Sequence, residues 1–384
     1  MGVEMENNSV GLYIHFPFCK RKCFYCDFPS YSGKEHFMDE YLGSVKKEID
    51  GIKEHIQNRC VNTVFWGGGT PTLFHGEKLA SLLDYCRDSF SLSIDAEITT
   101  EANPETIDKH KLKTLRDSGV NRISFGMQAG QDKHIKKLGR LHDIEDVRRS
   151  VSWAKQVGYD NINLDLMFGL PKQTINDWME TLSMAVDMGV EHISTYGLII
   201  EEDTPFYMLE KEGNLHIPHE DIERQMYYSA IQYLQGKGYI QYEISNFAKP
   251  GKECKHNLIY WDNKEYLGIG SSAHSSLNGQ RWYNYRNITQ YIDKINKSQT
   301  PVEKCHRIDI EEQRFETIMM GLRLIEGINK KNFYNRFGNS LGYYYGEAID
   351  YLKKTGMLIE TQENIRLTNK GIDLQNSVLL EFMD

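Results

Sequence analysis

The alternation of short apolar strands with amphipathic helices over the first 200 residues most constrains the fold. Helices are predicted at 35–57, 77–89, 105–117, 143–157 and 174–188. Successive strand–helix units require a parallel sheet with right-handed crossovers, in either an open doubly wound sheet or a barrel. The six strands are predicted at 10–16, 62–66, 96–102, 121–127, 161–168 and 192–200.

Helix boundary signals support this order of elements. Gly119, Gly158 and Gly189 each follow a predicted helix and precede a strand, where glycine commonly ends a helix. Asn103 and Pro104 resemble an N-cap followed by proline at the first helical position. We therefore expect a helix to begin at 105.

Three polar residues, Glu101, Gln128 and Asp165, lie in or just after predicted strands. The carboxyl ends of parallel strands form the functional face of a barrel, so these residues are candidates for ligand binding. For any one of them, capping of a neighbouring helix or loop is an equally good explanation.

After residue 215 the pattern changes. A helix near 219–236 leads into a tract at 250–286 that is rich in glycine, histidine and aromatic residues. From about 307, three helices and a two-stranded hairpin indicate a small winged-helix-like α+β domain. Acidic residues in its helix YYGEAIDYLKKTG favour packing or partner docking over DNA binding. We predict domains at 1–215, 216–304 and 305–384.

Composition excludes several classes of function. A formal charge of −9 argues against a general nucleic-acid-binding surface. No apolar run reaches the roughly 20 residues that a membrane-spanning helix needs, and MGVEMENNSV lacks the pattern of a secretory leader. Seven cysteines, three of them clustered, make a poor disulfide framework. We therefore expect a cytoplasmic protein.

The clustered cysteines are Cys19, Cys23 and Cys26, in the pattern C-x3-C-x2-C. Thiolates bind zinc as well as iron–sulfur clusters. Either His15 or His36 could complete a four-ligand zinc site. Three thiolates on a cubane cluster would instead leave one iron open to a small molecule, and the cations at 20–22 suit an electron-rich cluster.

The cysteine pattern follows a first strand and has an aromatic residue just before its last cysteine. Together with several later segments, it resembles the radical S-adenosylmethionine (radical SAM) superfamily, in the branch of oxygen-independent coproporphyrinogen III oxidases and the heme chaperone HemW family. These segments are WGGGTPT (66–72), TTEANPE (99–105), SFGMQ (124–128), LGRLHD (138–143) and NLDLMFGLP (163–171).

The resemblance implies a partial parallel (β/α)6 barrel followed by the winged-helix-like domain. It implies that Cys19, Cys23 and Cys26 ligate a [4Fe-4S] cluster whose open iron binds S-adenosylmethionine (SAM). Taken alone, the glycines after the second strand are better explained by a tight turn. The SAM contacts implied by motif match are Tyr13, Tyr25, Gly68, Gly69, Thr70, Glu101, Gln128, Arg140 and Asp165.

The distal tract contains H-N-x-x-Y-W, with His256, Tyr260 and Trp261. From the residues alone, a structural histidine is the commoner explanation than a heme ligand. The motif resembles the signature of the heme chaperones, which implies heme binding here. Cys254 and His274 are weaker alternatives as ligands.

The oxidases of this branch carry a further cysteine where this chain has Phe28. The predicted function is therefore a heme chaperone that transfers heme to acceptor apoproteins. Coproporphyrinogen III oxidation in porphyrin biosynthesis is the alternative, and enzymatic activity stays open. The predicted partners are heme, the acceptors and a reductant such as a flavodoxin or ferredoxin, with no nucleic acid. A homodimer and peripheral membrane association also stay open.

Overall fold

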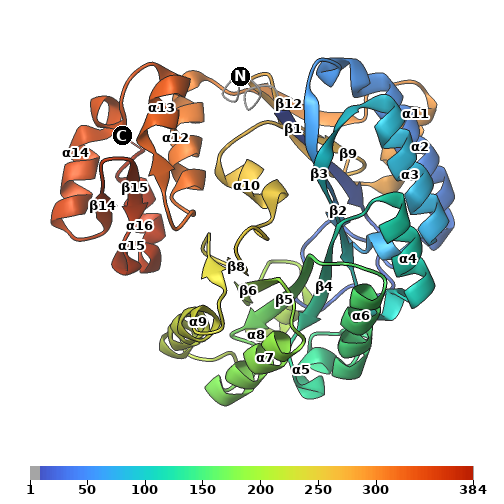
Figure 1. Cartoon of the computed structure of the whole chain (residues 1–384), viewed down its shortest axis with the longest axis horizontal. Coiled ribbons are helices and arrows are strands. Elements are labelled where there is room, and N and C mark those ends of the chain that lie inside the picture. Colours follow the sequence, from blue (N-terminus) through green and yellow to red (C-terminus); the bar gives the residue numbers. More distant parts are fainter. Residues whose placement is uncertain (1–8, 384) are drawn as a thin grey trace.

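The first six strands lie side by side, in chain order and all parallel (Figure 1). The computed structural model describes residues 9–383, so most of the segment examined for a leader lies outside the described residues. The pairing confirms the predicted α/β fold with repeated strand–helix units. The strands are β1 (Ser9–Phe16), β2 (Cys60–Gly68), β3 (Ser91–Ala102), β4 (Arg122–Gln128), β5 (Ile162–Phe168) and β6 (His192–Gly197).

Helices cover the outer side of this sheet, as Figure 1 shows for α2, α3, α4 and α6. The short helix α5 was not predicted from the sequence. The helices between the parallel strands are α2 (Met38–Ile52), α3 (Gly76–Ser89), α4 (Lys109–Ser118), α5 (Asp132–Lys137), α6 (Ile144–Gln156) and α7 (Ile175–Asp187). Single 3-10 turns are η1 (Glu35–Phe37), η2 (Lys53–Ile56), η3 (Pro71–Leu73) and η4 (Pro104–Thr106).

The predicted start of the third helix was wrong. Pro104 begins only the single turn η4, and Asn103 makes no side-chain cap there. The α-helix begins at Lys109, where the Asp108 carboxylate accepts from the Lys111 amide. The Asn103 side chain is instead committed to tertiary hydrogen bonds. The Asn103 side chain therefore bonds tertiary partners in place of capping the helix.

The two faces of the parallel sheet differ in polarity. On β1, Leu12, Ile14 and Phe16 are fully buried in the core shared with the outer helices. The alternate residues Tyr13 and His15 lie on the inner face. The same alternation puts polar residues on the inner face of the other strands. These include Glu97, Thr99, Arg122, Ser124, Asn163, His192 and Ser194, all of which are buried.

Strands from 240 to 307 extend this same sheet at both edges. One edge adds β9 parallel to β1, followed by three antiparallel strands, and the other edge adds β8 and β7. These strands are β7 (Ile240–Gln241), β8 (Asn246–Ala248), β9 (Tyr266–Ile269), β10 (His274–Leu277), β11 (Gln280–Asn284) and β12 (Val302–Arg307). The accompanying helices are α8 (Pro205–Lys211), α9 (Glu220–Gln235), α10 (Lys255–Trp261) and α11 (Ile288–Asn296).

The C-terminal region has its own apolar core and a three-stranded antiparallel sheet. The exact domain boundaries stay a prediction. The strands are β13 (Ile328–Asn329), β14 (Leu358–Glu360) and β15 (Asn364–Leu367). The helices are α12 (Ile310–Gly321), α13 (Lys330–Phe337), α14 (Leu341–Lys354), α15 (Asn369–Asp373) and α16 (Gln375–Leu380).

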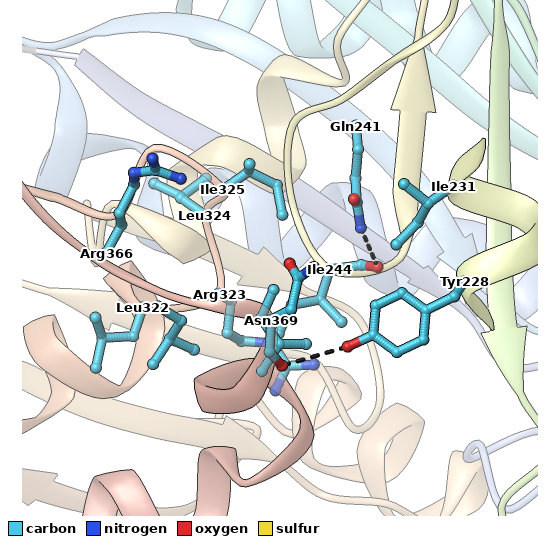
Figure 2. Close-up of a pocket in the computed structure, with 12 residues that line it drawn as sticks. Tyr228, Ile231, Gln241, Ile244, Leu322, Arg323, Leu324, Ile325, Arg366 and Asn369 are labelled. Atoms are coloured by element: carbon cyan, nitrogen blue, oxygen red, sulfur yellow. Dashed lines mark hydrogen bonds between the residues drawn. The ribbon is translucent and has the colours of Figure 1, made fainter. Parts of the chain in front are cut away.

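A small cavity of about 110 Å³ lies where this region meets α9 and the β7–β8 segment (Figure 2). The Tyr228 hydroxyl donates to the Asn369 carbonyl at 3.3 Å. The Gln241 amide donates to the Ile244 carbonyl at 3.0 Å.

Candidate functional site

The loop after β1 carries the three clustered cysteines and is held by backbone hydrogen bonds. The Cys19 amide donates to Tyr31, and the Tyr31 amide donates to Pro17. The Phe24 amide donates to the carbonyl of Leu138, just after α5, at 3.0 Å. These bonds fix the shape of the loop without using the thiols.

The three thiols are half-buried, and none is in a disulfide. Burial raises the pKa of Cys23, and it raises the pKa of Cys26 to about 11. Within residues 9–383, no three His, Cys, Asp or Glu side chains converge closely enough to hold one metal ion. A zinc site gathers its ligands around one ion, whereas the ligands of a cluster bind different irons and lie farther apart.

The glycines after β2 allow close packing of the cysteine loop. Gly68 has φ +104°, and a Cβ there would lie 2.2 Å from the His15 ring. A Cβ on Gly69 would lie 2.6 Å from the carbonyls of Phe16 and Phe18. The Gly69 amide donates to Phe16 at 2.8 Å. Much of the predicted glycine-rich turn thus serves contacts within the chain.

A hydrogen-bond chain joins Arg140 to the first cysteine. The Arg140 guanidinium donates to Asn103 Oδ1 at 2.6 Å and to the Tyr25 hydroxyl at 2.8 Å. Asn103 Nδ2 donates to Thr70 Oγ1 at 2.9 Å, and that hydroxyl lies 3.6 Å from Cys19 Sγ. Arg140 Nε is buried and has no partner among the described residues. The chain connects three predicted SAM contacts to the cysteine loop.

Two carboxylates face the inside of the sheet beside this chain. The Gly68 amide donates to Glu101 Oε2 at 3.1 Å. Burial, reinforced by the negative charge of Asp165, raises the pKa of Glu101 to about 8. Asp165 accepts hydrogen bonds from Ser124 and Asn163 at 2.8 and 2.9 Å. Glu101 therefore favours the protonated form more than an exposed glutamate does.

Gln128 ends β4 in a left-handed conformation, with φ +65°, and is buried. A Cβ on Gly126 would lie 2.8 Å from Gln128 Nε2 and 3.2 Å from an Arg140 nitrogen. The glycine therefore leaves room for both side chains. The structure brings Gln128, Arg140, Tyr25 and Thr70 to one end of the sheet.

Tyr13 connects this end to the inside of the sheet. Its hydroxyl lies 3.0 Å from His15 Nδ1, and His15 Nε2 lies 2.8 Å from the Pro29 carbonyl in the cysteine loop. Burial lowers the pKa of His15 to about 4. The Tyr13 ring stacks on Phe65 and His256, with centroids 6.2 and 6.4 Å apart.

His256 lies on the inner side of the sheet in α10 and is 1% exposed. Its Nδ1 lies 2.8 Å from Thr63 Oγ1, and its Nε2 lies 2.9 Å from the Tyr260 hydroxyl. Burial lowers the pKa of His256 to about 3. The Glu97 carboxylate accepts from the amides of Lys255 and His256 at the start of α10. Both ring nitrogens are thus already hydrogen-bonded.

Of the other predicted heme contacts, Tyr260 packs against His256 and Tyr266, whereas Trp261 faces the C-terminal region. The Arg323 guanidinium lies 4.9 Å from the Trp261 ring centroid, and Trp261 Nε1 is buried with no hydrogen-bond partner in the described part of the chain. Of the weaker alternatives, Cys254 is fully buried, and its thiol donates to Glu97. His274 is exposed and stacks on Tyr283.

Residues 13–185 match the radical SAM superfamily, and residues 308–374 match the HemN C-terminal domain. A heme chaperone HemW of Bacillus subtilis (strain 168) is 39% identical over 97% of this chain and 98% of its own length. The chain belongs to the heme chaperone HemW family. A heme chaperone HemW of Lactococcus lactis (strain IL1403) is 35% identical over 97% of this chain and 96% of its own length. That of Mycobacterium tuberculosis (strain H37Rv) is 32% identical over 98% of this chain and 95% of its own length.

The solved coproporphyrinogen III oxidase HemN of Escherichia coli shares the fold of this HemW-family chain, with a TM-score of 0.85. The match covers 98% of this chain and 90% of the oxidase, at 22% identity. It therefore supports the barrel and C-terminal region, and it does not transfer an activity. No helix within residues 9–383 is long and apolar enough to cross a membrane.

Membership of the radical SAM superfamily implies a [4Fe-4S] cluster and SAM as cofactors. The donor set fits: three half-buried thiols without disulfides share one loop, and a buried Arg140 nitrogen near them has no hydrogen-bond partner within residues 9–383. The assignment of individual residues to SAM or heme stays a prediction.

Sequence reasoning missed Asn103, which joins Arg140 to Thr70, and Thr63 and Glu97, which hold α10. The position of Asn103 within TTEANPE was a usable signal, but it was interpreted as a helix cap. Glu97 carried a weaker sequence signal, since a carboxylate in an apolar strand requires a buried partner. Thr63 is unremarkable in sequence.

Proposed function

We propose that this protein is a heme chaperone that carries a [4Fe-4S] cluster and SAM and transfers heme to acceptor proteins. The observation that most directly supports this proposal is the match to curated heme chaperones along nearly the whole chain. The described site is compatible with this proposal, because the cysteine loop and the H-N-x-x-Y-W helix both pack against the same sheet.

On this proposal, Cys19, Cys23 and Cys26 hold the cluster. When bound, the cluster supplies one-electron chemistry and an open iron for the amino and carboxylate groups of SAM. Arg140 carries a fixed positive charge in a buried setting, which suits a carboxylate. Glu101 offers a carboxyl group beside the glycine turn, where it can bind a hydroxyl or amino group.

His256 is the proposed axial ligand of heme, with Tyr260 and Trp261 contacting the macrocycle. Ligation by His256 requires release of its hydrogen bond to either Thr63 or Tyr260. Each such bond contributes about 1 kcal/mol net. Heme binding at this residue should therefore be coupled to a movement of α10.

The proposed partners are heme-acceptor proteins and a reductant such as a flavodoxin or ferredoxin. A homodimer, peripheral membrane association and a cytoplasmic location stay predictions. The net charge of −9 supports the proposal that nucleic acid is not a partner.

The deciding experiment is anaerobic reconstitution of the full chain followed by heme titration, with and without cluster and SAM. Saturable heme binding, followed by transfer of heme to an apo-hemoprotein, is the expected result. Absence of saturable binding in every cofactor state would contradict the proposal.

Coproporphyrinogen III oxidation is the alternative, supported by the shared fold and by a full set of matching SAM positions. Phe28 stands where the oxidases carry a further cysteine, and its side chain is 59% exposed. We therefore expect no conversion of coproporphyrinogen III to protoporphyrinogen IX by the reconstituted protein. Product detected by chromatography would establish the oxidase instead.

A further inference from the structure

Arg122 is a buried arginine on the inner face of the sheet whose charge has no direct partner. It begins β4 and is 2% exposed. It forms no ion pair within residues 9–383, and its Nε is buried there without a hydrogen-bond partner. Burying a charged group without direct partners costs stability. This guanidinium is therefore a candidate for binding a ligand.

Three other arginines in the described part of the chain also have a buried Nε without a partner, but each uses the rest of its guanidinium group. Arg140 donates two hydrogen bonds, and Arg281 forms an ion pair. Arg323 lies over the Trp261 ring. Among residues 9–383, Arg122 makes no such hydrogen bond, ion pair or ring contact. An unpaired Nε is shared by these arginines, whereas an unused guanidinium group distinguishes Arg122.

The polar groups around Arg122 are bound to other partners. Glu97 accepts from the amides at the start of α10, and Asp165 accepts two side-chain hydrogen bonds. The Tyr242 hydroxyl lies 2.9 Å from His192 Nε2. Burial opposes the charge of Arg122, but ionisable neighbours that include these groups keep its pKa above the usual value. The guanidinium is therefore charged, and its neighbours balance that charge without contacting it directly.

Arg122 lies near the proposed heme ligand and near an accessible part of the inner face. Burial lowers the pKa of His256, and the positive charge of Arg122 adds to this effect. Toward the carboxyl ends of the strands, the inner-face side chains of Phe65 and Glu101 are half-buried, and Tyr196 is 39% exposed. The inner face is thus closed beside α10 and more open beyond it.

We propose that Arg122 binds a carboxylate of the heme that His256 ligates, and so forms a subsite for a propionate group on the inner face of the sheet. The inference rests on the proposed function and adds to it the recognition of the heme's acidic side chains. A guanidinium presents paired N–H donors that match the two oxygens of a carboxylate. On this proposal, the movement of α10 that frees His256 also gives the propionate access to Arg122.

The competing explanation is that Arg122 only balances the carboxyl groups of Glu97 and Asp165. In that case, replacing Arg122 would weaken the fold and would affect every form of heme equally. A carboxylate subsite instead predicts a loss of affinity that is confined to heme with free propionates. Blocking the propionates on the ligand therefore separates the two explanations.

The test titrates the reconstituted full chain with hemin and with hemin dimethyl ester, whose propionates are both blocked, in the same detergent buffer. The parent should bind hemin roughly tenfold more tightly than the ester, because a charge-assisted pair is lost with the ester. Arg122→Gln should bind both forms with the affinity that the parent has for the ester. Arg122→Lys keeps the charge beside Glu97 and Asp165 but lacks the paired donors, so it should keep part of the preference.

Arg148→Gln is the matched control, since Arg148 lies on the outer helix α6 with a side chain that is 40% exposed. It should keep the full preference for hemin, and circular dichroism and iron content check that each variant folds. An equal loss of affinity for both ligands in Arg122→Gln, or an undiminished preference for hemin in Arg122→Gln or Arg122→Lys, would overturn the inference.

Two further outcomes distinguish this inference from the proposed function. Absence of saturable hemin binding in the parent would contradict the proposed function itself. Saturable binding by the parent without a preference for hemin over the ester would contradict the propionate subsite alone. Titration with SAM should give the same affinity in Arg122→Gln and the parent, and weaker SAM binding with an unchanged preference for hemin would assign Arg122 to SAM instead.

Discussion

The cysteine loop and helix α10 both carry residues of family motifs, but they differ in their readiness for a ligand. In the cysteine loop, backbone bonds hold the fold, and the three half-buried thiols are not in disulfides. In α10, His256 is buried, and both of its ring nitrogens are hydrogen-bonded within the chain. The cysteine loop can bind a cluster without local opening, whereas His256 of α10 must first release a hydrogen bond before it can bind heme.

This contrast has a physical cause. Backbone bonds fix the loop without occupying its side chains, while an unpaired ring nitrogen of a buried histidine costs stability. Its satisfied bonds stabilise the fold and compete with ligation. The predictions below test this contrast, beginning with the largest expected effect.

Replacing Cys23 by serine should abolish the cluster while leaving the fold intact. The loop keeps its backbone hydrogen bonds, so the thermal midpoint of the cluster-free protein should change little. Iron content and visible absorption after reconstitution measure the loss. Cys305→Ser is the control, because Cys305 is exposed and lies outside the loop. Retention of a full cluster in Cys23→Ser would remove this ligand assignment.

Replacing His256 by alanine should lower the free energy of unfolding by about 2–4 kcal/mol, because it removes a buried ring and leaves Thr63 unpaired. The same variant should lose heme affinity. Tyr260→Phe removes only the partner of Nε2, so it should increase heme affinity roughly fivefold by freeing the ligand. Heme titration and denaturant unfolding measure the two effects. Unchanged heme affinity in both variants would place the ligand elsewhere.

Replacing Asn103 by alanine should weaken SAM binding to the reconstituted protein by roughly tenfold, or about 1.4 kcal/mol, because Arg140 loses an anchoring hydrogen bond. Iron content should be preserved. Equal SAM affinity in Asn103→Ala and the parent would show that the chain does not position Arg140.

Replacing Glu101 by glutamine should flatten the pH dependence of stability in the cluster-free protein. Its pKa is raised from 4.5 to about 8 in the fold, so the native state keeps a proton that the unfolded chain loses. Stability therefore falls as pH rises between these values, by at most about 1.4 kcal/mol per pH unit from this group.

Denaturant unfolding at several pH values measures this slope. Glu48, whose pKa is raised by burial to about 7, contributes a slope that remains in the variant. Glu303→Gln, at an exposed position, should leave the slope unchanged. An identical slope in Glu101→Gln would show that Glu101 is ionised throughout this range.

Much of the fold was predictable because hydrophobic alternation and helix-ending glycines are local signals. Gly119 adopts φ +106° at the end of α4, as its position indicated. The start of α4 was not predictable, because the Asn103 side chain found stronger tertiary partners than a helix cap. The last parallel strand ends at Gly197, although its apolar pattern continues to 200. An apolar run does not specify where pairing with a neighbour ends.

The sequence alone determined the alternation of strands and helices, the cysteine spacing and the family, since these depend on patterns along the chain. Only the tertiary structure decided that the glycine turn packs against the cysteine loop and that His256 has both nitrogens engaged. Burial and hydrogen-bond satisfaction are properties of spatial neighbours, and those neighbours come from distant strands.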